Sequence, residues 1–160
     1  MARNDLTTGI QQSVLDRLVG GGESMHWEAS LEQLKSALRR DLEWLLNTRR
    51  TIVPLPEDAE ELPSSVFNFG LPDLTSMSKD DPETRHRLLR YVEEAVGRFE
   101  PRLTDVRVSI MLDESRERRE LHFMIEGLLR RDPVPEEVAF DTVLRIVTGE
   151  IEVRGDADEK

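Results

Sequence analysis

Glu100 and Arg102 flank Pro101, so a carboxylate and a guanidinium lie close together in the chain. A glycosidase needs a protonated acid facing an ionised carboxylate, about 5–5.5 Å away in retaining enzymes and about 6.5–9.5 Å away in inverting ones. A neighbouring guanidinium favours the ionised carboxylate, which makes Glu100 a poor general acid. Because the chain has 33 acidic residues, a suitable spacing of two carboxylates carries little weight. A bidentate ion pair, within the chain or across an interface, explains Glu100 and Arg102 better.

Other catalytic patterns are missing from the sequence. His26, His86 and His122 are dispersed without the spacing of metal ligands, and we interpret them as surface or edge histidines. The chain has no Gly-x-Ser-x-Gly sequence for a serine nucleophile. Gly20 to Gly22 follows no strand pattern and precedes no Lys-Ser or Lys-Thr, so it indicates a flexible joint and not a phosphate-binding loop. The sequence therefore predicts no catalytic residue, no metal site and no cofactor.

The composition restricts the partners and the compartment. A net charge of −11 opposes non-specific binding to nucleic acid or to anionic membranes. The basic runs Arg116–Arg119 and Arg130–Arg131 are brief and lack interleaved aromatic residues, which indicates solvated loops. No segment approaches the roughly 20 apolar residues of a membrane span, and Met1–Gln12 lacks the apolar core of a signal peptide. Because cysteine is also absent, we predict a cytoplasmic protein without direct membrane insertion.

The elements that must position these residues begin with helices. Ile10 to Leu18 has a short helical pattern, and a longer helix is predicted after a capping box of Ser30 and Gln33. Its apolar stripe consists of Leu31, Leu34, Leu38, Leu42, Leu45 and Leu46. The charged residues mostly outside this stripe are predicted to be solvated; they are Arg39, Arg40, Asp41 and Glu43. Arg49 and Arg50 are placed in the last turn, where cations favour the carbonyl end of a helix.

Aromatic residues divide between the helix and the connection that follows it. Trp27 and Trp44 are interpreted as core or partner-binding anchors, not as groups that stack on a cofactor. From Thr51 to Pro82 the chain carries five prolines and no periodicity, which is typical of a functional or surface-laid connection. Within it, Val66 to Leu71 is apolar, so this stretch either packs on the core or is offered to a partner.

The second half of the chain changes from helix to strand. Asp81 and Pro82 restart a helix as its cap and first-turn proline. The buried side of this helix is predicted to be Leu88, Leu89, Val92, Val96 and Phe99. Beyond Pro101 apolar residues alternate, which indicates strands. The alternating runs are Val106 to Leu112, Leu121 to Leu129 and Val138 to Ile146, with Asp113 to Glu120 as a hairpin connection and Ile151 to Val153 as a short last strand.

Helices followed by strands predict an α+β fold, with amphipathic helices packed on one face of a small antiparallel or mixed sheet. We expect a flexible segment at residues 1–12, a single domain at 13–153 and a disordered acidic tail at 154–160. The last strand lies near the terminus, where it would form an edge able to accept a strand from another chain.

Three strings in the chain closely resemble the baseplate wedge family of contractile injection machines. That family includes TssE of bacterial type VI secretion and relatives in large contractile-tailed phages. The strings are Arg40–Arg50, Asn68–Asp73 and Phe99–Leu103, and the resemblance extends from about Ser13 to Val153, the strand Val138–Val147 included. Within the first string, the run Asp41–Arg50 favours type VI over phage. Two departures are Phe67 and Phe69, where relatives often carry an aliphatic residue and a tyrosine.

The resemblance implies a non-enzymatic component of a type VI secretion baseplate. Glu-Pro-Arg recurs in the family, so Glu100, Pro101 and Arg102 are implied to fix the protein in the wedge beside TssF and TssG, with TssK reached indirectly. The sheet is implied to pair with the sheath proteins TssB and TssC and to template sheath assembly, at the baseplate on the inner face of the cell envelope. Phe69, Leu71 and Asp73 belong to a matching string and are the other predicted partner-binding residues.

Two alternatives stay open at this point. A peptidoglycan glycosidase is suggested by the acidic surface and by the "lysozyme-like" label that some relatives carry. A generic acidic adaptor would bind a basic partner with steep salt sensitivity. Under the favoured hypothesis, charge reversal at Arg102 is predicted to leave the isolated fold intact and to abolish assembly.

Overall fold

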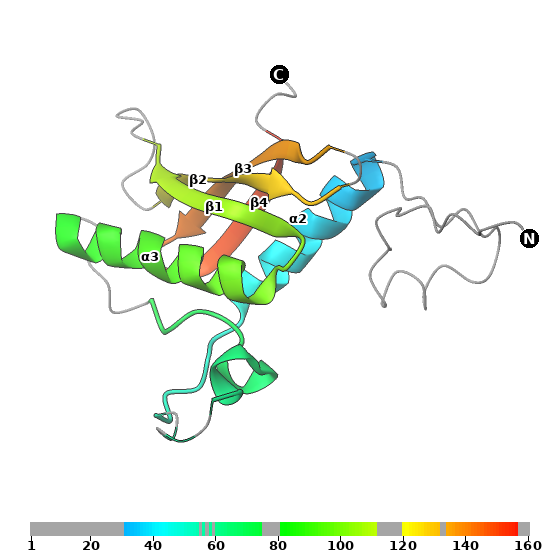
Figure 1. Cartoon of the computed structure of the whole chain (residues 1–160). Coiled ribbons are helices and arrows are strands. Elements are labelled where there is room, and N and C mark those ends of the chain that lie inside the picture. Colours follow the sequence, from blue (N-terminus) through cyan, green and yellow to red (C-terminus); the bar gives the residue numbers. More distant parts are fainter. Residues whose placement is uncertain are drawn as a thin grey trace, which may run out of the picture.

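The computed structural model describes residues 31–54, 56, 58, 60–74, 81–111, 120–131 and 134–156. Within them, two α-helices lie on one face of a four-stranded antiparallel sheet of order β1-β2-β3-β4 (Figure 1). The helices are α2 (Leu31–Asn47) and α3 (Pro82–Phe99), with the 3-10 helices η1 (Leu62–Ser64) and η2 (Val66–Asn68) between them. The strands are β1 (Leu103–Ile110), β2 (Glu120–Leu129), β3 (Glu136–Arg145) and β4 (Glu150–Asp156). The predicted α+β fold is confirmed.

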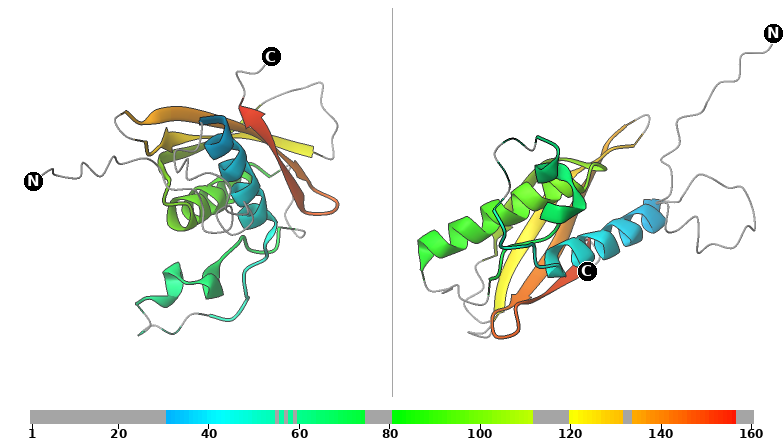
Figure 2. Two further views of the ribbon diagram at one scale, coloured as in Figure 1. Left: turned by 90° about the vertical axis from the view of Figure 1, so that its right-hand side faces the viewer. Right: turned by 90° about the horizontal axis from the view of Figure 1, so that it is seen from below.

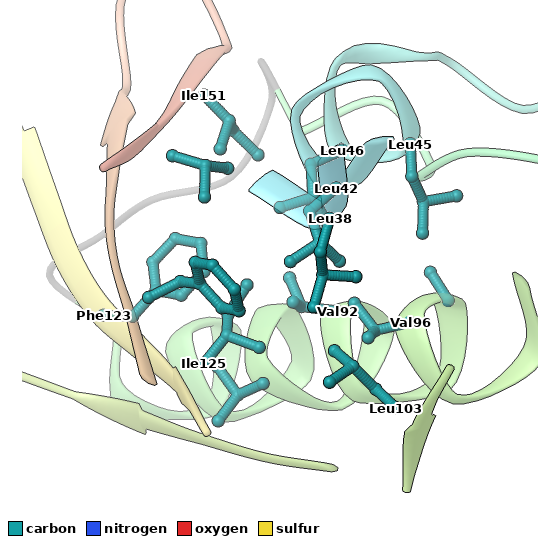
Figure 3. Close-up of a cluster of buried hydrophobic side chains, with 14 of the residues drawn as sticks. Leu38, Leu42, Leu45, Leu46, Val92, Val96, Leu103, Phe123, Ile125 and Ile151 are labelled. Carbon is teal, nitrogen blue, oxygen red and sulfur yellow. The ribbon is translucent and has the colours of Figure 1, made fainter. Parts of the chain in front are cut away.

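The core forms where the leucine stripe of α2 meets α3 and the inner face of the sheet (Figure 3). Five of the six predicted leucines are buried, and Leu31 packs against the cluster while partly exposed. On the sheet side, Phe123 and Ile125 are fully buried. Each fully buried side chain of this size contributes roughly 1.5–3 kcal/mol relative to exposure. The helical spacing of the leucines therefore both predicts α2 and fixes which of its sides faces the sheet.

The predicted place of Arg49 and Arg50 in the last helical turn is wrong, because α2 ends at Asn47. Immediately after it, the Thr48 carbonyl accepts a hydrogen bond from the N–H of Leu71 at 2.8 Å, and the N–H of Arg50 donates to the Leu71 carbonyl at 2.9 Å. These bonds draw the chain into an isolated parallel bridge between Arg49 and Leu71 instead of a further helical turn. The guanidinium of Arg50 then lies 5.6 Å from the centre of the Tyr91 ring.

The start of α3 follows the sequence prediction. The carboxylate of Asp81 accepts hydrogen bonds from the N–H groups of Glu83 and Thr84 at 3.2 and 3.1 Å, and Pro82 is the first helical residue. These bonds satisfy donors that the first helical turn leaves without partners. Of the predicted buried side, Leu88, Val92 and Val96 are buried. The other two residues, Leu89 and Phe99, are partly buried against the core.

An extra residue in β1 changes which of its side chains face the core. Thr104 pairs with Leu128 and Arg107 with Glu126, so β1 advances three residues while β2 advances two. This is a β-bulge, and Asp105 within it has a φ of 52°. The bulge lets both Leu103 and Val108 be buried although they are an odd number of residues apart. The predicted strand therefore begins earlier than Val106, at Leu103.

The last strand is longer than the predicted Ile151–Val153, since β4 spans Glu150–Asp156 and pairs with β3 as far as Phe140 and Asp156. It includes the first residues of the expected disordered tail at 154–160, and residues 157–160 lie outside the described part. An irregularity between Phe140 and Thr142 accommodates one extra residue of β4. The alternation of Ile151 and Val153 places both in the core, as predicted.

The connection from α2 to α3 extends away from the sheet, beyond the two helices (Figure 2). The connection comes back to the end of α2 at Gly70. This residue has a φ of 105°, which glycine adopts readily and other residues adopt rarely. A Cβ at this position would lie 2.2 Å from the carbonyl oxygen of Thr48. Gly70 therefore permits the close approach of the two ends of the connection at the Arg49–Leu71 bridge.

Several sequence predictions concern residues outside the described ranges. They are the helix at Ile10–Leu18, the joint at Gly20–Gly22, the anchor Trp27, the cap Ser30, the flexible segment at 1–12 and the arginine run Arg116–Arg119. Among the helices that are described, none has the length and apolar character that a bilayer crossing requires.

Candidate functional site

Arg102 lies between the end of α3 and the start of β1 and forms the predicted bidentate ion pair within the chain. Its Nε donates to Oε1 of Glu100 at 2.6 Å and its Nη2 donates to Oε2 at 2.5 Å. The backbone N–H of Arg102 also donates to Oε1 of Glu100 at 3.2 Å. Glu100 ends α3 with its N–H bonded to the Val96 carbonyl, so the helix terminus positions the carboxylate.

A second carboxylate, from α2, completes this ionic cluster. Nη2 of Arg102 donates to Oδ2 of Asp41 at 2.7 Å, and the guanidinium of Arg40 donates to Oδ1 of Asp41 at 3.0 and 3.1 Å. Arg40 in turn lies 5.2 Å from the centre of the Trp44 ring. The interpretation of Arg40 and Asp41 as merely solvated is therefore wrong. Asp41 links α2 to the Glu100–Arg102 pair, and we call Arg40, Asp41, Glu100 and Arg102 the ionic cluster.

Burial makes this cluster different from an ordinary surface ion pair. The Glu100 side chain is only 6% exposed, and those of Arg102 and Asp41 are 21% and 22% exposed. Hydrogen bonding to Glu100 raises the pKa of Arg102, and Asp41 adds to this effect against the opposing cost of burial. The arginine therefore stays charged at every physiological pH. A buried charge is tolerated only with its partners in place, so each member holds the others in position.

The cluster lies at one side of a groove of about 350 Å³ between α2 and the end of α3. The groove is lined by Asp41, Trp44, Leu45, Phe69, Phe99, Glu100, Pro101 and Arg102. Phe69 and Phe99 meet edge to face, with ring centres 5.3 Å apart. Trp44 is 54% exposed, although tryptophan is usually among the well-buried residues. An exposed aromatic ring beside a positioned guanidinium is typical of the centre of a protein interface.

The charged groups that line the groove are already engaged with one another. Both of its carboxylates accept hydrogen bonds from Arg102. Within the ranges that the structure describes, no group of three or more histidine, cysteine, aspartate or glutamate side chains could hold a metal ion. Among these same residues, Nη1 of Arg102 makes no hydrogen bond, so it can donate to a docking partner.

The structure brings four of the six predicted partner-binding residues together. Glu100, Pro101, Arg102 and Phe69 all line the groove. Leu71 is 2% exposed and belongs to the core, so its side chain is not available to a partner. Asp73 is half-exposed and lies 3.9 Å from the guanidinium of Arg49. The string Asn68–Asp73 thus combines one groove residue with residues that fix the connection.

Sequence reasoning missed Asp41 and Arg40 as site residues and misplaced His122. His122 is 6% exposed, and its Nε2 lies 3.5 Å from a Glu120 carboxylate oxygen, so the surface interpretation of this histidine is wrong. A signal for Asp41 existed, because it belongs to the Arg40–Arg50 string. Its partner Arg102 is 61 residues away in the chain, so local spacing could not connect them.

Comparison with known proteins gives one family and one solved structure. The family model of baseplate wedge protein gp25 matches residues 32–134. A chain in a structure of the baseplate complex from the type VI secretion system is 19% identical, with a TM-score of 0.47, and the match covers 69% of this chain and 93% of that chain. No curated protein matches.

Proposed function

Since the chain belongs to the family of baseplate wedge protein gp25, we propose that this structural baseplate component joins a type VI secretion wedge to the contractile sheath and templates sheath assembly. It acts through recognition and catalyses no reaction. Its neighbours in the wedge are TssF and TssG, with TssK reached indirectly, and its sheath partners are TssB and TssC. It works in the cytoplasm, at the baseplate on the inner face of the cell envelope.

The observation that supports this proposal is the groove with its ionic cluster. Trp44 offers an exposed ring at the groove. The ionic cluster next to it is held by hydrogen bonds from Arg102 to Glu100 and Asp41, and from Arg40 to Asp41. Side chains that are fixed before binding lose little conformational freedom when a partner docks. A wedge neighbour that inserts apolar side chains between Trp44 and Phe69 and accepts a hydrogen bond from Arg102 would use all of these features.

Charge reversal at Arg102 is a poor test of the groove. A glutamate at position 102 would place a third carboxylate beside those of Asp41 and Glu100. The Glu100 side chain is only 6% exposed, so water could not screen the repulsion there. Such a change removes the partner of a buried charge and destabilises the protein. The expectation from sequence that this variant keeps an intact fold is therefore replaced by an expected loss of stability.

Trp44→Ala tests the groove without disturbing the core, because more than half of the Trp44 surface is already exposed. Reconstitution with purified TssF and TssG is expected to show affinity weakened by about 30-fold or more, as for the loss of a central interface tryptophan worth at least about 2 kcal/mol. Ile52→Ala is the matched control, since Ile52 is 94% exposed and lies outside the groove. Unchanged binding of the Trp44 variant would refute the assignment of the groove as the wedge contact.

A further inference from the structure

The connection between α2 and α3 exposes apolar side chains and buries a polar one. Val66 and Phe67, which we call the apolar tip, are 90% and 41% exposed, whereas Asn68 next to them is 9% exposed. Among the described side chains that form or border the core, neither residue of the apolar tip is found. The tip lies on η2, in the connection that extends away from the sheet (Figure 2). Single exposed apolar residues are ordinary, but adjacent ones on a projecting segment are typical of an interaction site.

Hydrogen bonds explain why Asn68 is buried and its neighbours are not. Nδ2 of Asn68 donates to the Pro63 carbonyl at 3.1 Å, and its backbone N–H donates to the Ser65 carbonyl at 3.0 Å. Oγ of Ser65 accepts from the N–H of Phe67 at 3.3 Å and donates to the Leu62 carbonyl at 2.9 Å. These bonds join η1 to η2. The buried asparagine therefore fixes the backbone, and the backbone holds the apolar tip outward.

The two 3-10 helices are attached to the end of α3 on both sides of the apolar tip. Before the tip, Nη1 of Arg98 donates to the Pro63 carbonyl at 3.4 Å. After the tip, the ring of Phe69 meets that of Phe99 edge to face, with centres 5.3 Å apart. Arg98 and Phe99 both belong to the last turn of α3. A segment held in this way gives up little conformational freedom when a partner binds it.

The charge of the connection restricts the kind of partner. Residues 51–69, which we call the arm, contain Glu57, Asp58, Glu60 and Glu61 but no lysine or arginine. The described members of this set, Asp58, Glu60 and Glu61, are exposed. Such an arm repels anionic lipid headgroups, which disfavours a membrane surface. A second copy of this chain, with its net charge of −11, is disfavoured for the same reason. Lysine or arginine on another protein would complement the arm.

We propose that the apolar tip is a second docking point, which inserts into an apolar pocket edged with lysine or arginine on a neighbouring baseplate protein. That the neighbour belongs to the baseplate rests on the proposed function. The tip is distinct from the groove, because neither Val66 nor Phe67 lines it. The two side chains form the dry centre of the contact, and the arm carboxylates lie at its polar rim.

Photo-cross-linking of the full chain in its baseplate complex tests the contact. A benzophenone amino acid replaces Phe67 in one preparation and, as a control, Val147 in another; Val147 is 73% exposed and lies between β3 and β4. The complex is isolated through a tag on this chain and irradiated. Position 67 is expected to cross-link to another baseplate protein, at an apolar segment flanked by lysine or arginine, and position 147 is not expected to reach that segment.

The cross-linking outcomes separate this inference from the proposed function. If the baseplate complex forms but position 67 links only to a second copy of the chain, to lipid or to nothing, the docking point alone is refuted. A chain that is recovered without any baseplate protein refutes the proposed function and the docking point together.

Two truncations measure how much the apolar tip contributes. Affinity for the purified cross-linked protein is expected to fall by about tenfold in Phe67→Ala and by about threefold in Val66→Ala. Val147→Ala is the matched control, since it removes the same atoms as Val66→Ala from another exposed valine. Phe67→Leu should retain most of the affinity, because it keeps a large apolar side chain. The thermal midpoint should stay unchanged in all four variants, and full affinity in folded Phe67→Ala would contradict the proposal.

A charge variant tests the basic edge of the partner pocket. Glu60→Gln combined with Glu61→Gln should slow association by about threefold at low salt and flatten its salt dependence, with dissociation nearly unchanged, as for charges at the rim of an interface. Glu126→Gln combined with Glu137→Gln is the matched control, because it removes the same charge from exposed positions of the sheet. Association that responds equally to both pairs, or to neither, would overturn the assignment of a basic partner.

Discussion

Arg102 and Arg145 each contact more than one carboxylate, but they differ in how deeply their side chains are buried. Arg102 bonds to Glu100 and Asp41 at the groove and is 21% exposed. Arg145, on the outer face of the sheet, contacts Glu150 at 3.0 Å and Glu152 at 3.2 Å and is 45% exposed. Hydrogen bonds to carboxylates raise the pKa of both arginines. Protonation therefore cannot distinguish them, and the difference lies in what remains when the guanidinium is removed.

Removal of Arg102 leaves the Glu100 carboxyl surrounded by protein without its partner, whereas removal of Arg145 leaves carboxylates that water can reach. Buried pairs are costly to break and exposed pairs contribute little. Both arginines link elements of the fold, since Arg102 joins the end of α3 to α2 and Arg145 joins β3 to β4, but only the first link is largely buried. Burial, not the number of contacts, decides which arginine the fold depends on.

The largest expected effect is on stability. Arg102→Ala should lower the free energy of unfolding by roughly 3–5 kcal/mol, because a buried carboxylate loses its partner. Arg145→Ala should leave the denaturation midpoint nearly unchanged. Urea denaturation of both variants and the parent chain checks this. Equal losses from the two substitutions would show that burial does not separate the two clusters.

A double replacement sharpens the comparison by separating stability from recognition. Glu100→Leu combined with Arg102→Leu should recover most of the stability lost in Arg102→Leu, because an apolar pair leaves no buried charge without a partner. Binding to TssF and TssG should nevertheless stay weakened, since the guanidinium that a partner would contact is gone. Urea denaturation and a binding titration on the same three proteins measure both quantities. Recovery of binding together with stability would mean that the cluster is only structural.

The parts of this comparison that sequence could predict are the local ones. The Glu100–Arg102 pair was predictable because only Pro101 separates the two residues, and the leucine stripe of α2 because helical spacing is local. Asp41 could not be assigned to Arg102, since 61 residues separate them and only the packing of α2 beside the end of α3 brings them together. The bond between Asn47 and Ile151 spans 104 residues and has no signal in either segment.

Two features of the structure have physical reasons that a sequence pattern does not contain. The bulge at Asp105 changes the side of the strand on which Leu103 lies, and the glycine that faces it, Gly127, belongs to the neighbouring strand β2. Leu71 was grouped with partner-binding residues because its string matches a family, yet the bridge to Arg49 carries it into the core. Motifs in this chain therefore mix residues that line the groove with residues that shape the backbone, and burial separates the two kinds.

The smallest expected effect concerns a carboxylate that is held mainly by neutral donors. The hydroxyl of Thr84 donates to Asp81, and this bond is the main cause that lowers the pKa of Asp81 below 3.8, with the N–H groups of Glu83 and Thr84 adding to it. Because the folded pKa lies below the unfolded one, the stabilisation is complete above the unfolded value and is lost as pH falls through the folded value.

Asp81→Ala should therefore lower the thermal midpoint slightly at neutral pH, and the difference from the parent chain should shrink as pH falls from about 5 to about 2. Asp58→Ala is the matched control, because Asp58 is exposed and caps no described helix. Calorimetry across this pH range measures both variants. A deficit for Asp81→Ala that persists at the lowest pH would show that the ionised carboxylate is not what stabilises α3. Exposed carboxylates would then matter even less to this fold than the contrast between Arg102 and Arg145 suggests.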